Sequence, residues 1–383
     1  MNILIAHGGG PTPVMNSSLQ GVIEGARLSG NRCRLYAGRF GAEGILKDDL
    51  IDLTDTSESI VKKLAYTPAS AIGSCRTKLT QDNYPTVLET LKKHDINCLI
   101  YNGGNDSMDT CYKLSQLAAK SGLDVSVMGI PKTIDNDLAV TDHSPGYGSA
   151  ARFAAITAAE VGADASALPI HIVVMELMGR NTGWITGAAS FGQRISRCPM
   201  MILLPERLLD TEAFLKEAEK QFRKGQGLLV VVSEGVRGLD GQPIADSGIV
   251  DGFGHKVPGG AAQRLSELIM QNVGIKSRSE KPGLLGRSSM PYVSEIDRAE
   301  AYAVGKAAVE AALGGETGSM ISIQAHRGKT YRFSLSKVPL DLVANKEKKF
   351  PTEWISDWNV EDPFIDYCLP LIGGNLPEFA HLR

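Results

Sequence analysis

Short apolar runs that end near glycine or proline recur along the chain and constrain its fold more than any other feature. Six such runs alternate with segments of helical pattern, at residues 3–6, 98–101, 125–130, 171–177, 201–204 and 228–232. They lack the polar alternation of a strand with one solvent-facing side, so each is predicted to be a strand buried on both faces. Alternating strands and helices of this kind predict an α/β fold with two doubly wound, Rossmann-like lobes and mainly parallel sheets.

Length and charge agree with this fold and exclude several classes of function. The chain has 383 residues, 43% hydrophobic and 22% charged, which is enough for two closely packed lobes. Its formal net charge is −3, so no overall basic field favours nucleic acid or an anionic membrane as a partner. Six scattered cysteines form no CxxC pair, and no apolar stretch reaches membrane-spanning length. We therefore expect a cytoplasmic protein without a disulfide framework.

The clearest helical pattern covers residues 211–224. Four apolar residues fall on one stripe of this helix: Phe214, Leu215, Ala218 and Phe222. Thr211 stands where an N-cap is expected, with a carboxylate in the following turn.

Three loops follow predicted strands, at the sheet edge where doubly wound folds bind their ligands. The first loop contains Gly8, Gly9 and Gly10 and precedes a helix that opens around Asn16. Consecutive glycines let backbone amides approach an anion, and the helix N-terminus adds partial positive charge. A tight turn without a ligand explains the glycines equally well, so this loop alone leaves both interpretations open.

The second loop, residues 102–107, combines two glycines with Asn105 and Asp106, and a helix is expected from about Asp109. Amide and carboxylate oxygens at a strand end fit a Mg²⁺-bound phosphate. The alternative is an Asx turn that caps the next helix. Two such loops on one sheet favour the ligand interpretation.

The third loop, residues 131–137, contains Lys132, Asp135 and Asp137. Phosphoryl transfer needs a carboxylate to accept the hydroxyl proton and cations to neutralise the transferred group. A lysine supplies such a cation as a point charge. A solvated acidic turn is the alternative, but it would need neither the lysine nor two neighbouring glycine loops.

Together these loops resemble the phosphofructokinase family, and specifically its pyrophosphate-dependent branch. The resemblance is carried by Gly-Gly-Pro-Thr-Pro-Val-Met-Asn at 9–16, Pro-Lys-Thr-Ile-Asp-Asn-Asp at 131–137 and Met-Gly-Arg-Asn-Thr-Gly-Trp at 178–184. Residues 141–150, 233–235 and 343–349 are similar too, so it spans nearly the whole chain. It implies the phosphofructokinase fold, with a phosphate-donor lobe (1–145 plus about 285–340) and a sugar-phosphate lobe (146–284 plus 341–383).

The resemblance also implies a role for each matching residue. Asp135 corresponds to the general base, and the other implied catalytic residues are Lys132, Thr133, Asp137 and Arg180. The implied donor-binding residues are Gly9, Gly10, Arg76, Gly104 and Asp106. The implied sugar-phosphate contacts are Thr133, Asp135, Met178, Gly179, Arg180, Glu234, Arg278, Leu284 and Arg287. One of the last two arginines is implied to reach in from a neighbouring subunit, so a homodimer or homotetramer is expected.

The choice of donor follows from two side chains. ATP-using relatives have glycine at the positions that match Asp106 and Lys132. A carboxylate at 106 would repel the α-phosphate of ATP, whereas a lysine at 132 can neutralise the leaving phosphate of a smaller donor. The pair predicts pyrophosphate, with ATP as the alternative. The implied reaction is reversible transfer to the 1-hydroxyl of fructose 6-phosphate in glycolysis, with Mg²⁺.

The chain departs from the family pattern at several positions. Asn105 replaces an aspartate that helps to hold Mg²⁺, so it is expected to be a weak metal ligand. Leu284 and Gly286 replace polar residues, and His171 falls near an acceptor-phosphate arginine of ATP-using relatives. These changes leave open another acceptor, such as sedoheptulose 7-phosphate, or a non-catalytic sugar-phosphate sensor. A nicotinamide-dependent dehydrogenase is disfavoured, because no GxGxxG follows the first strand.

Overall fold

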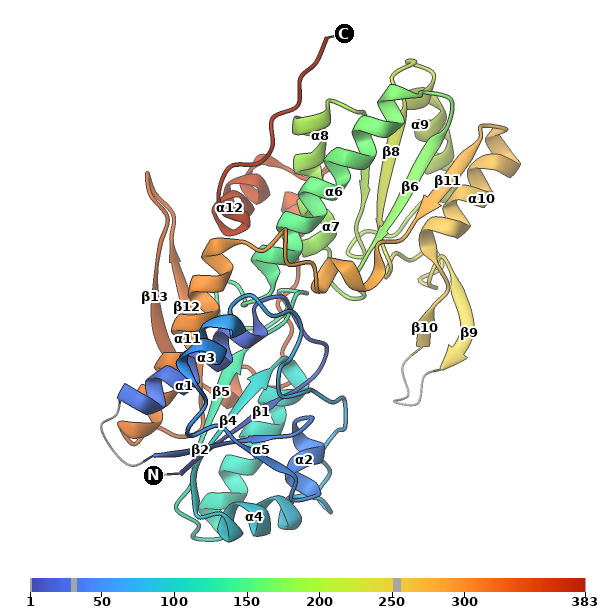
Figure 1. The fold of residues 1–383 in the computed structure, drawn as a ribbon. Coiled ribbons are helices and arrows are strands. Elements are labelled where there is room, and N and C mark those ends of the chain that lie inside the picture. The colour runs from blue at the N-terminus through green and yellow to red at the C-terminus, as the bar shows by residue number, and fades with distance from the viewer. Residues whose placement is uncertain (1, 29–32, 251–255, 383) are drawn as a thin grey trace. The chain divides into compact units, whose positions relative to one another are not determined.

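The computed structural model describes residues 2–28, 33–250 and 256–382, and the chain folds into two compact units (Figure 1). The first unit comprises Met1–Tyr147 and Arg287–Lys348, and the second comprises Gly148–Gly286 and Lys349–Arg383. The chain therefore passes between the units three times. Over the residues described, no helix combines the length and apolar character needed to cross a membrane.

The first unit is built on a seven-stranded sheet in the order β13-β12-β5-β4-β1-β2-β3. Its strands are β1 (Asn2–His7), β2 (Arg34–Gly38), β3 (Leu50–Asp52), β4 (Ile96–Gly103), β5 (Ser126–Pro131), β12 (Ser319–His326) and β13 (Arg332–Pro339). The strands from β12 to β2 run parallel, and only the two edge strands pair antiparallel.

Helices cover both faces of this sheet. They are α1 (Met15–Leu28), α2 (Ala42–Leu46), α3 (Glu58–Leu64), α4 (Tyr84–Lys93), α5 (Asn105–Lys120) and α11 (Glu295–Leu313), with a short η2 (Leu340–Leu342). Ile3 and Ile5 of β1 join the core under α1 and α11, whereas Leu4 and Ala6 join the core under α4 and α5. Alternate residues of β1 thus face two different cores, which explains why its sequence is apolar throughout.

The second unit contains a four-stranded parallel sheet in the order β11-β6-β8-β7. Its strands are β6 (Ile172–Leu177), β7 (Met200–Leu203), β8 (Leu228–Ser233) and β11 (Ser277–Glu280), and a separate hairpin pairs β9 (Asp246–Val250) with β10 (Lys256–Pro258). Its helices are α6 (Tyr147–Ala167), α7 (Trp184–Ala188), α8 (Ser190–Ser196), α9 (Thr211–Phe222), α10 (Ala261–Val273) and α12 (Asp362–Ile372), with η1 (Gly283–Arg287) and η3 (Thr352–Trp354). The first residue of α6 and the last residue of η1 belong to the first unit. Trp184, 2% exposed, packs among Phe350, Trp354 and Phe364.

All six predicted strands are confirmed, as β1, β4, β5, β6, β7 and β8, and the α/β class with mainly parallel sheets is confirmed with them. The predicted cap of α9 is wrong by one residue. Asp210, not Thr211, is the N-cap, and its Oδ1 accepts hydrogen bonds from the backbone amides of Glu212 and Ala213 at 3.0 Å. The carboxylate satisfies two of the free amides and also places negative charge at the helix N-terminus.

Helix α5 also begins earlier than predicted. It starts at Asn105 instead of about Asp109, with Gly104 as N-cap, because the Gly104 carbonyl already accepts from the amides of Ser107 and Met108 at 3.0 Å. The loop between β4 and the helix is consequently very short, and Asn105 stands in the first helical turn.

Residues 341–348, which we expected in the second lobe, pack on the first unit. Asn345 Nδ2 donates to Asp109 Oδ1 at 2.8 Å, and the Lys348 amide donates to the Asp137 carbonyl at 2.7 Å. These bonds explain why the first unit ends at Lys348.

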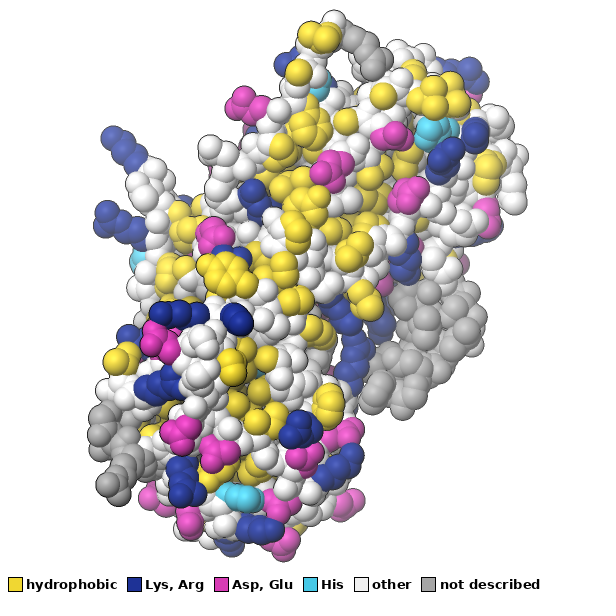
Figure 2. All heavy atoms as spheres, viewed as in Figure 1, with side chains coloured by type: hydrophobic (Ala, Val, Ile, Leu, Met, Phe, Trp, Pro, Cys, Tyr) yellow, Lys and Arg dark blue, Asp and Glu magenta, His cyan; other side chains and the backbone are white. Residues whose placement is uncertain are grey.

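The face of the first unit seen in Figure 2 carries Lys and Arg side chains interspersed with Asp and Glu. This mixture agrees with the small net charge of the whole chain.

Candidate active site

The three predicted loops of the first unit meet at one edge of its sheet. Strands β1, β4 and β5 are parallel neighbours, so their carboxyl ends lie side by side. The Gly8 amide donates to the Asn102 carbonyl at 2.9 Å, and the Lys132 amide donates to the Gly103 carbonyl at 3.1 Å. Each loop is therefore joined to its neighbour by a backbone hydrogen bond.

Lys132 is the central cation of this cluster. Its side chain is buried, and Nζ donates to the Gly10 carbonyl at 2.9 Å. Burial lowers the pKa of Lys132 to about 8; the carboxylates of Asp135 and Asp137 oppose that shift, and two nearby arginines add to it. At neutral pH the amine is protonated and lies between the glycine loop and two carboxylates.

The glycine loop brings the two arginines to the same place. Gly9 has a left-handed φ of 78°, and a Cβ at this position would lie 3.2 Å from Lys132 Nζ. A side chain at Gly10 would collide with the guanidinium of Arg287 and would also approach Arg76 Nη2 at 3.8 Å. Three cations thus surround backbone that only glycine allows to come so close, an arrangement suited to a compact polyanion.

Arg287 lies in the first unit, beside Gly10 of the donor loop. The resemblance implies Arg287 and Arg278 as sugar-phosphate contacts, and Arg278 lies on β11 of the second unit.

The third loop holds its carboxylates by local hydrogen bonds. The Asp135 amide donates to Thr133 Oγ1 at 3.0 Å. Asn136 adopts a left-handed φ of 55°, and its Oδ1 accepts from the Ser144 amide and from Lys348 Nζ, both at 3.1 Å. Asp135 is partly exposed, as a base that meets a substrate must be.

The first turn of α5 presents oxygen atoms to the same loop. In the orientation that satisfies its amide, the Asn105 nitrogen donates to the carbonyls of Lys346 at 2.9 Å and Val343 at 3.3 Å, so its oxygen faces Asp137. Burial raises the pKa of the Asp137 carboxyl. An amide oxygen facing a buried carboxylate fits a hard cation such as Mg²⁺, which takes few protein ligands. Over the described ranges, no group of three or more His, Cys, Asp or Glu side chains could hold a metal by itself.

The two remaining donor residues lie at the start of the same helix. A Cβ at Gly104 would lie 3.6 Å from the Lys132 carbonyl, so the backbone of these loops is close-packed. Asp106 is exposed and forms an ion pair with Lys78 at 3.4 Å. Its carboxylate therefore lies at the exposed edge of the cluster, paired with Lys78.

The predicted sugar-phosphate residues of the second unit follow β6 and β8, which are parallel neighbours. The Gly179 amide donates to Glu234 Oε1 at 3.5 Å, and the Ser233 hydroxyl donates to the Gly179 carbonyl. Burial raises the pKa of the Glu234 carboxyl, while Arg180 is among the groups that oppose the shift. Met178, Gly179, Arg180 and Glu234 thus form one group at the carboxyl ends of two strands.

Arg278 and Leu284 lie on other elements of the second unit. Arg278 is exposed on edge strand β11 and pairs in register with Val173. Burial and the charge of Arg278 lower the pKa of the nearby His171. Leu284 lies in η1 and is 63% exposed.

Sequence reasoning assigns no role to two residues beside the loops of the first unit. His7 ends β1, is fully buried, and lies 2.8 Å from Ser70 Oγ through Nδ1; burial and Lys132 lower its pKa to about 3, so the ring is neutral. Lys348 binds Asn136, as described above. The only sequence signal for Lys348 was the resemblance of residues 343–349 to the family, which named no contact.

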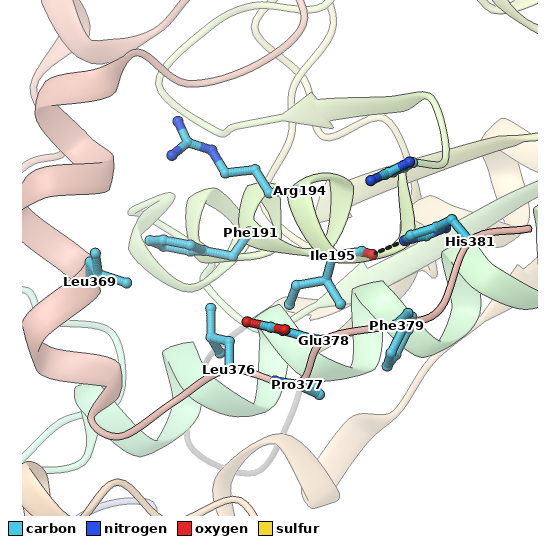
Figure 3. A pocket seen from close by; sticks show the side chains of 10 residues that line it. Phe191, Arg194, Ile195, Leu369, Leu376, Pro377, Glu378, Phe379 and His381 are labelled. Carbon is cyan, nitrogen blue, oxygen red and sulfur yellow. Dashed lines mark hydrogen bonds between the residues drawn. The ribbon is translucent and has the colours of Figure 1, made fainter.

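A hollow of about 440 Å³ lies elsewhere in the second unit, between α8 and residues 376–381 (Figure 3). Phe191, Ile195 and Leu369 form its apolar wall, and His381 Nε2 lies 2.9 Å from the Ile195 carbonyl. None of the predicted site residues lines it.

Comparison with known proteins agrees with the geometry of the loops. The phosphofructokinase family model matches residues 2–312. The chain is 38% identical to the pyrophosphate–fructose 6-phosphate 1-phosphotransferase of Halomonas elongata, over 99% of this chain and 94% of that one. It is 40% identical to the enzyme of the same name from Methylococcus capsulatus, over 99% and 93%.

A solved structure resembles the whole fold. The crystal structure of the pyrophosphate-dependent phosphofructokinase from Marinobacter aquaeolei superposes with a TM-score of 0.89 at 37% identity, over 99% of this chain and 93% of that chain. The predicted phosphofructokinase fold is confirmed by this likeness. With a family model that matches most of its length and close relatives that cover it almost completely, the chain belongs to the phosphofructokinase family.

Proposed function

We propose that the chain transfers a phosphoryl group from pyrophosphate to the 1-hydroxyl of fructose 6-phosphate, giving fructose 1,6-bisphosphate and phosphate. The observation that carries the proposal is the buried Lys132, bonded to the Gly10 carbonyl and grouped with Arg76 and Arg287. The printed names of the relatives, which describe this reaction for those proteins, support it.

At the donor end, the three cations neutralise the phosphates of pyrophosphate. Lys132 faces the glycine loop, and its proposed role is to offset the negative charge that develops on the leaving phosphate. Asp106 remains exposed at the edge of the cluster and disfavours the extra phosphate and nucleoside of ATP by charge repulsion. The same donor set accepts phosphate in the reverse reaction, so we also propose that transfer is reversible and serves glycolysis.

At the acceptor end, Asp135 accepts the proton of the sugar hydroxyl. Thr133 orients the Asp135 backbone, and Asp137 lies next to Asn105 in the same cluster. Met178, Arg180 and Glu234 are proposed to bind the sugar phosphate, with Glu234 accepting hydrogen bonds from sugar hydroxyls.

Mg²⁺ is proposed as the cofactor. Asn105 Oδ1 and the Asp137 carboxylate would hold it, with phosphate and water oxygens completing its coordination. When bound, the ion supplies positive charge that offsets the charge of the phosphates.

We further propose that the protein is cytoplasmic and forms a homodimer or homotetramer. Arg278 lies exposed on an edge strand, where it could reach a neighbouring subunit. Size-exclusion chromatography with light scattering checks this, and a monomer at micromolar concentration would contradict it.

A coupled assay tests the reaction. Pyrophosphate and ATP are each combined with fructose 6-phosphate and with sedoheptulose 7-phosphate, in the presence and absence of Mg²⁺. The proposal expects turnover with pyrophosphate, fructose 6-phosphate and Mg²⁺ at least about 100-fold above that with ATP. A preference for sedoheptulose 7-phosphate would change only the identity of the proposed acceptor. If calorimetry showed that a sugar phosphate binds but no donor were turned over, the protein would instead be a non-catalytic sugar-phosphate sensor.

A further inference from the structure

Lys348 forms hydrogen bonds to both ends of the loop that follows Asp135, residues 136–142. Its partly buried side chain donates from Nζ to Asn136 Oδ1 at 3.1 Å and to the Asp142 carbonyl at 2.6 Å. Its backbone amide donates to the Asp137 carbonyl at 2.7 Å. One residue from the far end of the first unit therefore contacts residues 136, 137 and 142.

Asn136 is one of two residues of this loop with a left-handed backbone, the other being Val140. Asn136 is fully buried and has a left-handed φ of 55°, a conformation that asparagine adopts more readily than most residues with a Cβ and that its side-chain hydrogen bonds can hold. Its Oδ1 accepts from the Ser144 amide as well as from Lys348. Because Asn136 lies between Asp135 and Asp137, its backbone conformation sets the directions of both carboxylates.

The other attachment point of Lys348 is rigid. Asp142 accepts two hydrogen bonds of 2.7 Å from the Arg327 guanidinium and lies 2.9 Å from His143 Nδ1. His143 Nε2 in turn lies 2.6 Å from Glu300 Oε2 on α11. Burial disfavours a charged His143, but the carboxylates of Glu300 and Asp142 outweigh it and raise the pKa of His143 to about 9. A charged, buried network thus holds the carbonyl to which Lys348 is anchored.

We infer that Lys348 is a positioning residue, which holds the left-handed turn at Asn136 and thereby keeps Asp135 aimed at the acceptor hydroxyl. The inference rests on the proposed function, because it assigns Lys348 to the action of that general base. Lys348 acts through Asn136 and Asp142 and does not itself exchange a proton with the substrate.

The first test is kinetic. Lys348→Met removes the donor but keeps much of the side chain's length, and Lys346→Met is a matched control, because the exposed Lys346 uses only its backbone in the hydrogen bonds described. We expect Lys348→Met to lower kcat about 100-fold, with the KM for either substrate changed by less than about 3-fold. Lys346→Met should keep wild-type kinetics, and thermal unfolding confirms that both variants fold.

A double variant separates positioning from contact with the substrate. Asn136→Gly keeps the left-handed turn accessible but removes the acceptor of Lys348. If Lys348 acts through Asn136, the double variant should have a kcat less than about 10-fold below that of Asn136→Gly alone. A wild-type kcat for Lys348→Met would overturn the inference, and so would an unchanged kcat with a raised KM for the sugar phosphate.

Hydrogen exchange tests the role of Lys348 in holding the turn without any turnover. The Ser144 amide donates to Asn136 Oδ1, so its exchange reports whether the turn stays closed. We expect its exchange in Lys348→Met to be at least about 10-fold faster than in the wild type and in Lys346→Met. Equal exchange rates of the Ser144 amide in the wild type and both variants would refute the role of Lys348 in holding the turn. If the wild type does not use pyrophosphate but Lys348→Met still speeds exchange of the Ser144 amide, the proposed reaction is wrong, whereas the role of Lys348 in holding the turn is supported.

Discussion

The predicted donor residues and the predicted sugar-phosphate residues are supported by the fold to different extents. In the first unit, Lys132 is 4% exposed and already bonded to Gly10, with Arg287 against the same glycine. In the second unit, Arg278 is exposed and Leu284 is 63% exposed. Lys132 is therefore held in place before any ligand binds, whereas the side chains of these two acceptor residues are largely exposed to solvent.

This difference has an energetic consequence. A preorganised charge in a buried site loses little conformational freedom when its ligand arrives, whereas an exposed side chain must be ordered at that moment. Substitution of the buried Lys132 should therefore have a large effect on kcat/KM, and substitutions among the exposed acceptor residues should have a small effect, mainly on KM.

The largest expected effect is at Asp135, which belongs to the preorganised loop. Asp135→Asn keeps the size of the side chain but removes the base, so kcat should fall about 10³-fold. Pyrophosphate binding, measured by calorimetry, should change by less than about 3-fold, because the cations stay in place. Asp82→Asn, at an exposed position of the same unit, is the control. Retention of more than a tenth of wild-type kcat would remove Asp135 from its assigned role.

The next largest effect is expected at Lys132, which should also make kcat/KM for pyrophosphate depend on pH. Lys132→Met should lower kcat/KM for pyrophosphate about 100-fold, because a preorganised cation is lost. In the wild type, the pKa of Lys132 is lowered to about 8, so the amine is charged below that pH and kcat/KM for pyrophosphate should decrease as pH rises through about 8.

Lys132→Arg separates this decrease from other titrations. Arginine stays protonated throughout this range, so whatever activity Lys132→Arg keeps should not decrease near pH 8. The rates are measured as kcat/KM from pH 6 to 10. A decrease that persists unchanged in Lys132→Arg would assign it to a different group.

Much of this architecture was predictable from local patterns. The six apolar runs predicted buried strands because each fills two cores at once, as Ile3 and Leu4 do on opposite faces of β1. The loops that contain Lys132 and Gly9 were predicted to lie together, because neighbouring parallel strands have their carboxyl ends at the same edge of the sheet.

Other features depend on contacts between residues distant in sequence. The position of Arg287 beside Gly10 and the bond from Lys348 to Asn136 join segments that local patterns cannot pair. Helix α5 was placed four residues late because its cap is a backbone carbonyl of Gly104, which leaves no side-chain signal.

The two arginines test whether the contrast between the units extends to ligand preference. Arg287→Ala should raise the KM for pyrophosphate about 10-fold, the value of one charge-assisted hydrogen bond, because Arg287 lies against the donor loop. Arg278→Ala should raise only the KM for the sugar phosphate. Initial rates with each substrate varied in turn distinguish the two. If Arg287→Ala instead raised only the KM for the sugar phosphate, that result would support the role that the family resemblance implies.

The smallest expected effect is a decrease in KM at Leu284, an exposed acceptor position. Leu284 stands where the resemblance implies a polar residue, so Leu284→His would place a hydrogen-bond donor at a position that is now apolar and 63% exposed. A hydrogen bond made in such an exposed place contributes about 1 kcal/mol, so the KM for fructose 6-phosphate should fall about 3- to 5-fold with kcat unchanged. Leu285→His, at the equally exposed neighbour, should leave KM as it is. An equal decrease in KM in both variants would mean that added polarity, and not position 284, is responsible. Leu284 would then not be a specific contact of the sugar phosphate.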